Sequence, residues 1–151
     1  MGAGPYPAGG RSSGPCRSRG RAAGGNDTIS KPVVVDGRVY CGSHAGVYAL
    51  DAASGKVLWI TPKGAVWPPY NSPAVADGLV YTGSGEDSHL HAFEATNGKP
   101  RWTFATDGEV QGAPVVANGT IYFGSLTGTM YAVNAKTGGK IPAEYAHTDS
   151  G

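Results

Sequence analysis

The chain has 151 residues, of which 25 are glycine and 11 are proline, while charged residues make up only 15% and the formal net charge is +1. Such a composition is typical of short strands joined by tight turns, and the weak charge argues against duplex DNA as a partner, so we expect no nucleic-acid binding. No stretch approaches the ~20 consecutive apolar residues of a membrane span, and the N-terminus lacks the apolar segment of a signal peptide. We therefore expect no membrane segment in this chain.

Residues 1–30 consist mainly of Gly, Pro, Ser, Ala and Arg. This composition predicts a disordered tail, because it offers too little apolar surface to offset the loss of chain entropy. We interpret the tail as a solvated leader or as the result of a mis-assigned translation start, and we assign it no function. Cys16 lies in it and Cys41 beyond it. Two cysteines cannot form a disulfide framework, so the redox compartment stays open.

Beyond the tail the sequence repeats. The segments KPVVVDGRVYCGS, SPAVADGLVYTGS and APVVANGTIYFGS align without a gap, and Pro32, Pro73 and Pro114 recur at a step of 41 residues (73 − 32 and 114 − 73). A fixed period of this length is the sequence signature of a repeat architecture. We divide the repeat region, 31–143, at about residues 31–71, 72–112 and 113–143, which leaves 144–151 as a C-terminal tail.

Each repeat contains the signals of four strands. Asp36-Gly37 and its counterparts in the other copies lie between β-branched runs, where such pairs favour a two-residue hairpin turn. The runs 47–50 and 57–60 supply two further strands, with Gly55 in the turn between them. No helical period of 3.6 is present. The sequence predicts an all-β partial β-propeller with three four-stranded antiparallel blades of about 41 residues; a β-sandwich is the alternative.

A second motif carries a family resemblance. Residues 49–59, ALDAASGKVLW, follow the pattern A-x-D-x-x-x-G-K-x-x-W, which resembles the tryptophan-docking motif of quinoprotein (PQQ) dehydrogenase-like propellers. The resemblance covers about residues 31–141, although in the third copy an extra Gly139 shifts the spacing and no Trp follows. The docking residues it identifies are Ala49, Asp51, Gly55 and Trp59, then Ala92, Glu94, Gly98 and Trp102, then Ala132 and Gly138.

The resemblance implies a structural role for these residues. The Trp is expected to pack between neighbouring blades against small Ala and Gly residues, and the acidic residue to fix the turn. Family propellers commonly have about seven or eight blades, whereas three are visible here. Three blades leave unpaired edges, so we expect either the missing blades of a longer chain or self-assembly of several copies.

The resemblance also raises an enzyme hypothesis, with PQQ and calcium above the propeller axis. Enzymes of this kind carry adjacent cysteines and long loops with calcium ligands, whereas here the cysteines are isolated and the loops short. We therefore expect no enzymatic activity and no cofactor. His89-x-His91 is a weak metal candidate. Because His91 falls at the repeat position of Tyr48 and Tyr131, we expect it to pack rather than to bind a metal.

The segments between blades, TPKGAVWPPYNS and ATDGEVQGA, differ most among the copies, and loops on a rigid scaffold commonly carry binding. An exposed aromatic residue is a frequent anchor for a partner, although Trp67 could equally fill the blade junction. The candidate contact residues are Trp67, Tyr70, Asn71, Asp107, Glu109 and Gln111.

The expected function is a non-catalytic scaffold that binds a protein or a small ligand through these loops. Two alternatives follow from the resemblance: a fragment of a PQQ-dependent alcohol dehydrogenase, and the sensor portion of a receptor serine/threonine kinase. Related modules also include the scaffold lipoprotein of outer-membrane assembly. These relatives imply an extracytoplasmic location, which no signal in this sequence indicates.

Overall fold

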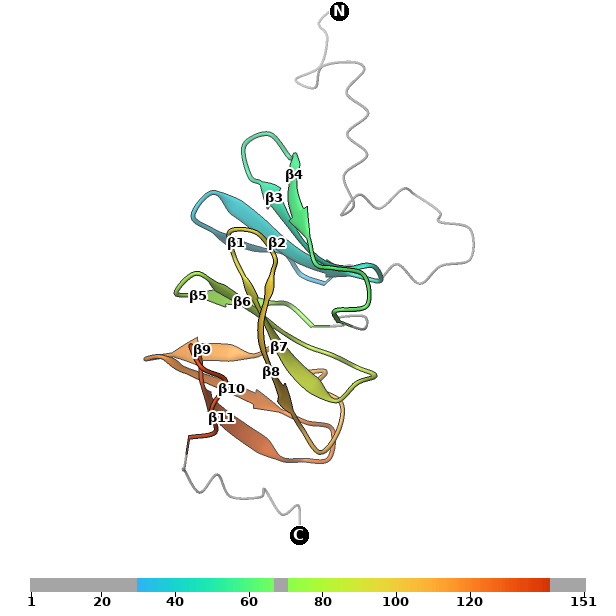
Figure 1. Ribbon diagram of the computed structural model, residues 1–151, viewed down its shortest axis with the longest axis vertical. Helices are drawn as coiled ribbons and strands as arrows, with labels where there is room; N and C mark the ends of the chain where they lie inside the picture. Colours follow the sequence, from blue (N-terminus) through green and yellow to red (C-terminus); the bar gives the residue numbers. More distant parts are fainter. Residues whose placement is uncertain (1–29, 67–70, 142–151) are drawn as a thin grey trace, which may run out of the picture.

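The computed structural model describes residues 30–66 and 71–141, which form three antiparallel sheets arranged in a row (Figure 1). The first sheet contains β1 (Val33–Val35), β2 (Arg38–Ser43), β3 (Gly46–Asp51) and β4 (Val57–Ile60). The second contains β5 (Ala74–Ala76), β6 (Leu79–Gly83), β7 (His89–Glu94) and β8 (Pro100–Ala105), and the third contains β9 (Val115–Ala117), β10 (Thr120–Gly124) and β11 (Met130–Asn134). In each sheet the strands pair in chain order. Among the described residues no helix is long and apolar enough to cross a membrane.

The predicted all-β propeller architecture is confirmed, with one difference in the third blade. Its described part has three strands, and up to residue 141 the predicted fourth strand is represented by a single bridge between Val133 and Lys140. The sequence also indicated that Gly139 shifts the spacing of this blade. The structure shows otherwise, because the Gly139 carbonyl accepts a hydrogen bond from Asn134 N at 2.8 Å, as the Lys99 carbonyl does from Glu94 N. Gly139 therefore replaces a lysine of the turn, and residues 142–151 lie outside the described part.

The first blade includes one residue that we had placed in the tail. Ser30 is buried, its amide donates to the Gly42 carbonyl at 3.0 Å, and its hydroxyl accepts a hydrogen bond from Gly42 N at 2.8 Å. The rest of the predicted tail, residues 1–29, lies outside the described residues.

The hairpin turns follow from their dipeptides. Asp36, Asp77 and Asn118 have φ angles of 49°, 50° and 51°, and each is followed by a glycine with a positive φ. Two consecutive positive φ angles define the turn whose twist matches the flanking strands, and Asp, Asn and Gly tolerate that conformation best. These turns fix the register of the first two strands in every blade.

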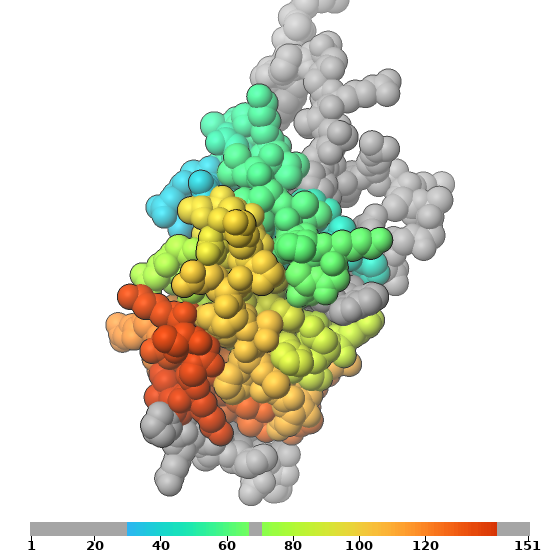
Figure 2. Space-filling view, in the orientation of Figure 1, coloured from blue at the N-terminus to red at the C-terminus, as the bar shows by residue number. Residues whose placement is uncertain are grey.

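The core lies between the sheets. One cluster joins Tyr40, Val47 and Trp59 of the first blade to Val80 and Phe93 of the second, and another joins the second blade to the third. Every residue of β6 is buried, as expected for a strand covered on both faces, whereas the outer strand β8 alternates between exposed and half-buried positions. In the space-filling view the three sheets abut as one continuous body (Figure 2).

Each of the two tryptophans that the structure describes docks on the blade that follows its own. The Trp59 indole N–H donates to the Ala95 carbonyl at 2.9 Å, and its ring covers Gly98 so closely that a Cβ there would lie 2.4 Å from the ring. Trp102 repeats the arrangement one blade later. Its N–H donates to the Ala135 carbonyl at 3.2 Å, and its ring covers Gly138.

A tyrosine in the second strand of each of the first two blades donates a hydrogen bond to the same carbonyl as the tryptophan of its blade. Tyr40 Oη donates to the Ala95 carbonyl at 3.4 Å, and Tyr81 Oη donates to the Ala135 carbonyl at 2.8 Å. The Tyr40 and Trp59 rings are 6.0 Å apart and tilted, a favourable distance for an aromatic pair. At each interface one backbone carbonyl therefore accepts hydrogen bonds from a tryptophan and a tyrosine of the neighbouring blade.

The acidic position of the motif holds the turn that presents this carbonyl. Asp51 Oδ1 accepts hydrogen bonds from the Ser54 amide at 2.7 Å and from its hydroxyl at 2.8 Å, which lower the pKa of Asp51. In the other blades Glu94 accepts from the Asn97 side chain, and Asn134 accepts from two backbone amides of its turn.

Replacing Trp59 with alanine should lower the free energy of unfolding by about 3–5 kcal/mol, because a buried ring and an inter-blade hydrogen bond are lost together. Chemical denaturation monitored by circular dichroism measures the change. Leu58→Ala is the matched control, since Leu58 is the preceding residue and is 46% exposed. Equal unfolding midpoints for Trp59→Ala and the parent chain would contradict the assigned role.

A pair of glycine variants separates ring contact from backbone strain. Gly98 and Gly55 hold the same turn position with φ angles of 74° and 70°, but a Cβ meets the Trp59 ring only at Gly98, and nothing lies within 4 Å at Gly55. Both changes to alanine cost about 1 kcal/mol for the positive φ. Gly98→Ala should cost clearly more, as thermal unfolding can measure. Equal losses in the two variants would show that the ring contact carries no weight.

Candidate partner-binding face

Both inter-blade connections lie on one side of the row of blades, at the same end of the strands in every sheet. Because the strands of each sheet are antiparallel and in chain order, the turns β2–β3, β6–β7 and β10–β11 lie at the same end as the connections β4–β5 and β8–β9. Backbone bonds join these segments: Val110 N donates to the Ser84 carbonyl at 3.1 Å, and Leu126 N donates to the Glu109 carbonyl at 2.9 Å. We call this end the loop face.

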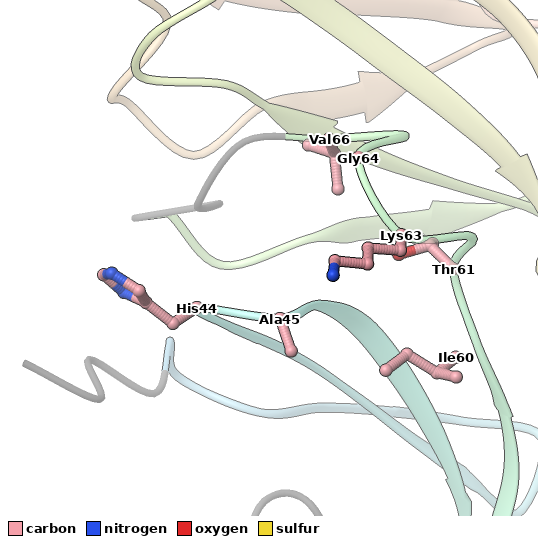
Figure 3. Close-up of a pocket in the computed structure, with 7 residues that line it drawn as sticks. All are labelled: His44, Ala45, Ile60, Thr61, Lys63, Gly64 and Val66. Carbon is pink, nitrogen blue, oxygen red and sulfur yellow. The ribbon is translucent and has the colours of Figure 1, made fainter. Parts of the chain in front are cut away.

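A cavity of about 440 Å³ opens on the loop face at the first blade (Figure 3). Its walls come from the β2–β3 turn, the end of β4 and the β4–β5 connection, and the lining residues are His44, Ala45, Ile60, Thr61, Lys63, Gly64 and Val66. Ile60 is 43% exposed. Figure 3 shows the Lys63 side chain extending from the connection toward the side on which His44 lies. The cavity thus combines an apolar wall with a cationic group.

The base of this cavity is held by Thr61. Its amide donates to the Val47 carbonyl at 3.0 Å, and its hydroxyl accepts a hydrogen bond from Val47 N at 3.1 Å. Gly46 has a φ of 132°, and a Cβ at that position would lie 2.3 Å from the Thr61 hydroxyl oxygen. Only glycine fits there, so the β2–β3 turn and the β4–β5 connection are locked together beneath the cavity.

The sequence drew attention to the β4–β5 connection, and one of the three contact residues proposed there is not on the surface. We had proposed Asn71 as a contact residue, yet it is buried, with an exposed fraction of 4%. Its side-chain amide donates to the Val110 carbonyl at 2.9 Å, and its Oδ1 accepts from the Thr82 hydroxyl at 3.1 Å. Asn71 therefore braces the second blade from inside. Trp67 and Tyr70 lie outside the described residues.

Asp107 lies on the loop face, but its carboxylate is already engaged. Oδ1 accepts hydrogen bonds from the hydroxyls of Ser125 and Thr127, both at 2.6 Å, and Oδ2 accepts from Thr129 at 2.5 Å. These donors, Ser125 foremost, hold the pKa of Asp107 well below its usual range. Asp107 thus ties the β8–β9 connection to the β10–β11 turn of the next blade.

Lys63 takes the place of Asp107 at the other blade junction. Each is followed by a glycine and precedes a buried valine by three residues, Val66 for Lys63 and Val110 for Asp107. Among the described residues Lys63 forms no ion pair within 4.0 Å. The two connections therefore differ in their contacts: the one with Asp107 is hydrogen-bonded to the turn of the following blade, and the one with Lys63 exposes a cation beside a cavity. The sequence contained this difference, but the prediction for this connection did not include Lys63.

Glu109 and Gln111 lie on the surface of the loop face. Gln111 Nε2 donates to Glu109 Oε2 at 2.9 Å, Gln111 is exposed and Glu109 is half-buried. Their side chains bond only to each other in the described part of the chain. They remain candidate contact residues, separated along the row of blades from the cavity of the first blade.

The two histidines of the weak metal candidate do not gather ligands around one point. His91 is buried, its Nε2 bonds to Asp87 Oδ2 at 2.8 Å, and its ring stacks on Phe93. Burial lowers the pKa of His91, against the opposing effect of Asp87. His89 Nδ1 contacts the Asp87 backbone carbonyl. Within residues 30–66 and 71–141 no group of three or more His, Cys, Asp or Glu side chains could hold a metal ion.

Comparison with known proteins places these features in a family. The family described as "Outer membrane protein assembly factor BamB" matches residues 13–93 and, in a second alignment, residues 44–141. The serine/threonine-protein kinase AfsK of Streptomyces griseus is 32% identical in an alignment of 117 positions, which covers 71% of this chain and 14% of the kinase.

Solved structures share the blade arrangement. BamB from Moraxella catarrhalis superposes with a TM-score of 0.65 and 20% identity, over 76% of this chain and 36% of that protein. The quinohemoprotein alcohol dehydrogenase ADHIIG from Pseudomonas putida HK5 superposes with a TM-score of 0.61 and 29% identity, over 74% of this chain and 19% of the enzyme. The chain therefore spans about a third of the first structure's length and about a fifth of the second.

The Asp107 hydrogen bonds predict a pH dependence. A carboxylate whose pKa is lowered by folding stabilises the folded state above its unfolded pKa of about 3.9, and that contribution is lost as the pH falls toward the folded value. Asp107→Asn should therefore lower Tm at pH 7, and the difference from the parent chain should shrink below about pH 4. Thermal unfolding at a series of pH values measures it. A Tm difference that stays constant down to pH 2 would contradict a stabilising role for the ionised Asp107 carboxylate.

Proposed function

Because this chain belongs to the PQQ-like β-propeller repeat family, we propose that it is a non-catalytic propeller module that binds a protein partner through the loop face of its first blade. The observation that carries the proposal is the cavity bounded by Ile60 and Lys63. The blades supply a rigid platform, and the loops at its end supply the contacts, which is the usual division of roles in repeat scaffolds.

The cavity favours a partner with an apolar side chain next to an acidic group. A volume of about 440 Å³ is within the range of small binding pockets and accommodates one or two side chains. Ile60 and Val66 offer apolar contact, and the Lys63 ammonium at the rim can pair with a carboxylate. An exposed segment of another protein, with a large apolar residue flanked by Asp or Glu, fits this chemistry.

Three observations support the proposal that the chain does not carry the cofactors of the quinoprotein enzymes. In residues 30–66 and 71–141 no three His, Cys, Asp or Glu side chains come together as metal ligands. The oxygens of Asp107, a carboxylate of the loop face, already accept three hydroxyl donors. The chain's two cysteines are not adjacent in sequence. These observations support a binding module over an enzyme, and no reaction step is assigned.

A random peptide library selected on the immobilised full chain tests the binding proposal. Recovered peptides should combine an apolar residue with an acid, and their affinity, measured by fluorescence polarisation, should fall about tenfold in Lys63→Glu and in Ile60→Ser. Lys99→Glu is the control, since Lys99 is an exposed lysine at the opposite end of the blades. Peptides whose affinity is unchanged by the Ile60 and Lys63 variants would contradict the proposed site.

Catalysis is tested separately. The full chain incubated with PQQ and calcium should show no dye-linked oxidation of primary alcohols above a protein-free control. A rate that is saturable in alcohol and requires both additions would overturn the non-catalytic proposal.

A further inference from the structure

The two blade junctions differ at the end of the strands that is opposite to the loop face. At the first junction the Arg38 side chain crosses to the second blade, where its Nη1 donates to the Ala95 carbonyl at 2.8 Å. Arg38 pairs with Asp51 in its sheet, and Leu79 pairs with Glu94 in the next, so Leu79 is the counterpart of Arg38. Leu79 has no side-chain donor. The second junction therefore lacks the guanidinium group that the first junction contains.

A cavity of about 330 Å³ opens at the second junction beside Leu79. Its walls come from the β5–β6 hairpin, the β7–β8 turn, the start of β8 and the docking turn of the third blade, which contributes Lys136. Leu79 itself is one of the lining residues and is 8% exposed. The cavity thus borders the side chain that stands in the place of Arg38.

A backbone acceptor lies next to this cavity. The Ala135 carbonyl receives the tryptophan of the second blade, as the Ala95 carbonyl receives that of the first. The Ala95 carbonyl also accepts from a tyrosine and from Arg38. The Ala135 carbonyl accepts from Tyr81 at 2.8 Å, but no arginine of the described residues bonds to it. A carbonyl in this position accommodates a guanidinium donor alongside two aromatic donors, and at Ala135 that donor is missing.

The charges around the cavity leave one carboxylate and one ammonium group without an ion pair. Arg101 Nη1 lies 3.3 Å from Glu94 Oε1, so these two charges balance. Asp77 and Lys136 form no ion pair within 4.0 Å in the described part of the chain. Burial, and after it the negative charge of Asp77, raises the pKa of Tyr81 to about 12. The Asp77 carboxylate therefore acts on the hydroxyl that bonds to the Ala135 carbonyl, and the two acceptors serve the same place.

We propose that this cavity binds the guanidinium group of an arginine, which pairs with the Asp77 carboxylate and donates to the Ala135 carbonyl. Arg38 shows the same group on the corresponding carbonyl one junction earlier. The planar fork of a guanidinium offers five donors, enough to serve a carboxylate and a carbonyl together. A volume of about 330 Å³ is within the range of small-molecule sites. The site is separate from the loop face, and the inference does not depend on partner binding there.

Two sources can supply this group. Free arginine also carries a carboxylate, which the exposed Lys136 ammonium can pair with. An arginine side chain within a peptide offers the guanidinium group alone. Both share the contacts with Asp77 and Ala135, and they differ in their use of Lys136.

The guanidinium contact is tested by an NMR chemical-shift titration of the full chain with butylguanidinium. We expect saturable binding in the millimolar range, as for other small fragments, and clearly weaker binding of butylammonium, which has the same charge but no planar fork. Asp77→Asn should weaken butylguanidinium binding about tenfold, because the charged acceptor is lost. Absence of saturable binding, or equal affinity for Asp77→Asn and the parent chain, would overturn the proposal.

Asp36→Asn is the matched control for this variant. Asp36 and Asp77 hold the same hairpin position with φ angles of 49° and 50°, and Asn118 holds it in the third blade with a φ of 51°. Asparagine therefore fits the turn in both variants. Because Arg38 already supplies the guanidinium group at the first junction, Asp36→Asn should leave the affinity for butylguanidinium unchanged. A tenfold loss in this control as well would place the ligand away from the second junction and contradict the assigned site.

The two sources are separated by titrating L-arginine and the blocked peptide acetyl-Ala-Arg-Ala-amide. Tighter binding of L-arginine, with the advantage removed in Lys136→Gln, would identify free arginine as the ligand. Equal affinities that Lys136→Gln leaves unchanged would identify an arginine side chain of a peptide. Either result supports a guanidinium site, whereas binding of neither compound would refute it.

Leu79→Arg supplies the guanidinium group from the chain itself. By analogy with Arg38 the new side chain should fill the cavity and abolish butylguanidinium binding. Thr120→Arg is the control, since Thr120 holds the same position in the third blade and no described blade follows it. Circular dichroism verifies that both variants fold. A folded Leu79→Arg chain with the parent affinity would overturn the assigned site, and the Asp77→Asn comparison decides independently of this variant's stability.

Discussion

The hydrogen bond from a tryptophan indole to an alanine carbonyl of the next blade is the contact on which the arrangement depends. Trp59 reaches Ala95 and Trp102 reaches Ala135 across the two blade interfaces. The bond is possible because a glycine in the docking turn leaves room for the ring. Each four-stranded sheet is too small to bury its own apolar faces, so the ring and the row of β-branched residues beside it supply the core. Stability is therefore a property of neighbouring pairs of blades.

This dependence explains why the same residues recur while the loops diverge. The docking turn, the hairpin turn and the buried tyrosine must match a neighbour and cannot vary independently. The two connections at the loop face take no part in this docking contact, and their contacts differ. Asp107 is bound by hydroxyls of its own chain, whereas Lys63 borders an open cavity. Regular blades that carry one open cavity between the β2–β3 turn and the β4–β5 connection are consistent with binding at that cavity.

The fold could be predicted from the sequence because the repeat fixes register. Asp-Gly and Asn-Gly dipeptides mark the hairpins, and their 41-residue step aligns every later strand. The direction of docking could not be predicted, since a motif within one blade does not state which blade receives its ring. The burial of Asn71 could not be predicted for a similar reason. Asparagine is common in surface loops, but the side-chain amide of Asn71 donates to the Val110 carbonyl, which is distant in sequence. A binding role for Lys63 could not be predicted either, because it depends on the adjacent cavity, which exists only in the folded chain.

A double-mutant cycle between Trp59 and Gly98 tests the central contact most directly. If the ring occupies the space above Gly98, an added methyl group is costly only while the ring is present. The free energies of unfolding of Trp59→Ala, Gly98→Ala and the double variant should then be non-additive, with the Gly98→Ala cost falling to that of the backbone strain alone once Trp59 is removed. Strict additivity of the two changes would contradict the account.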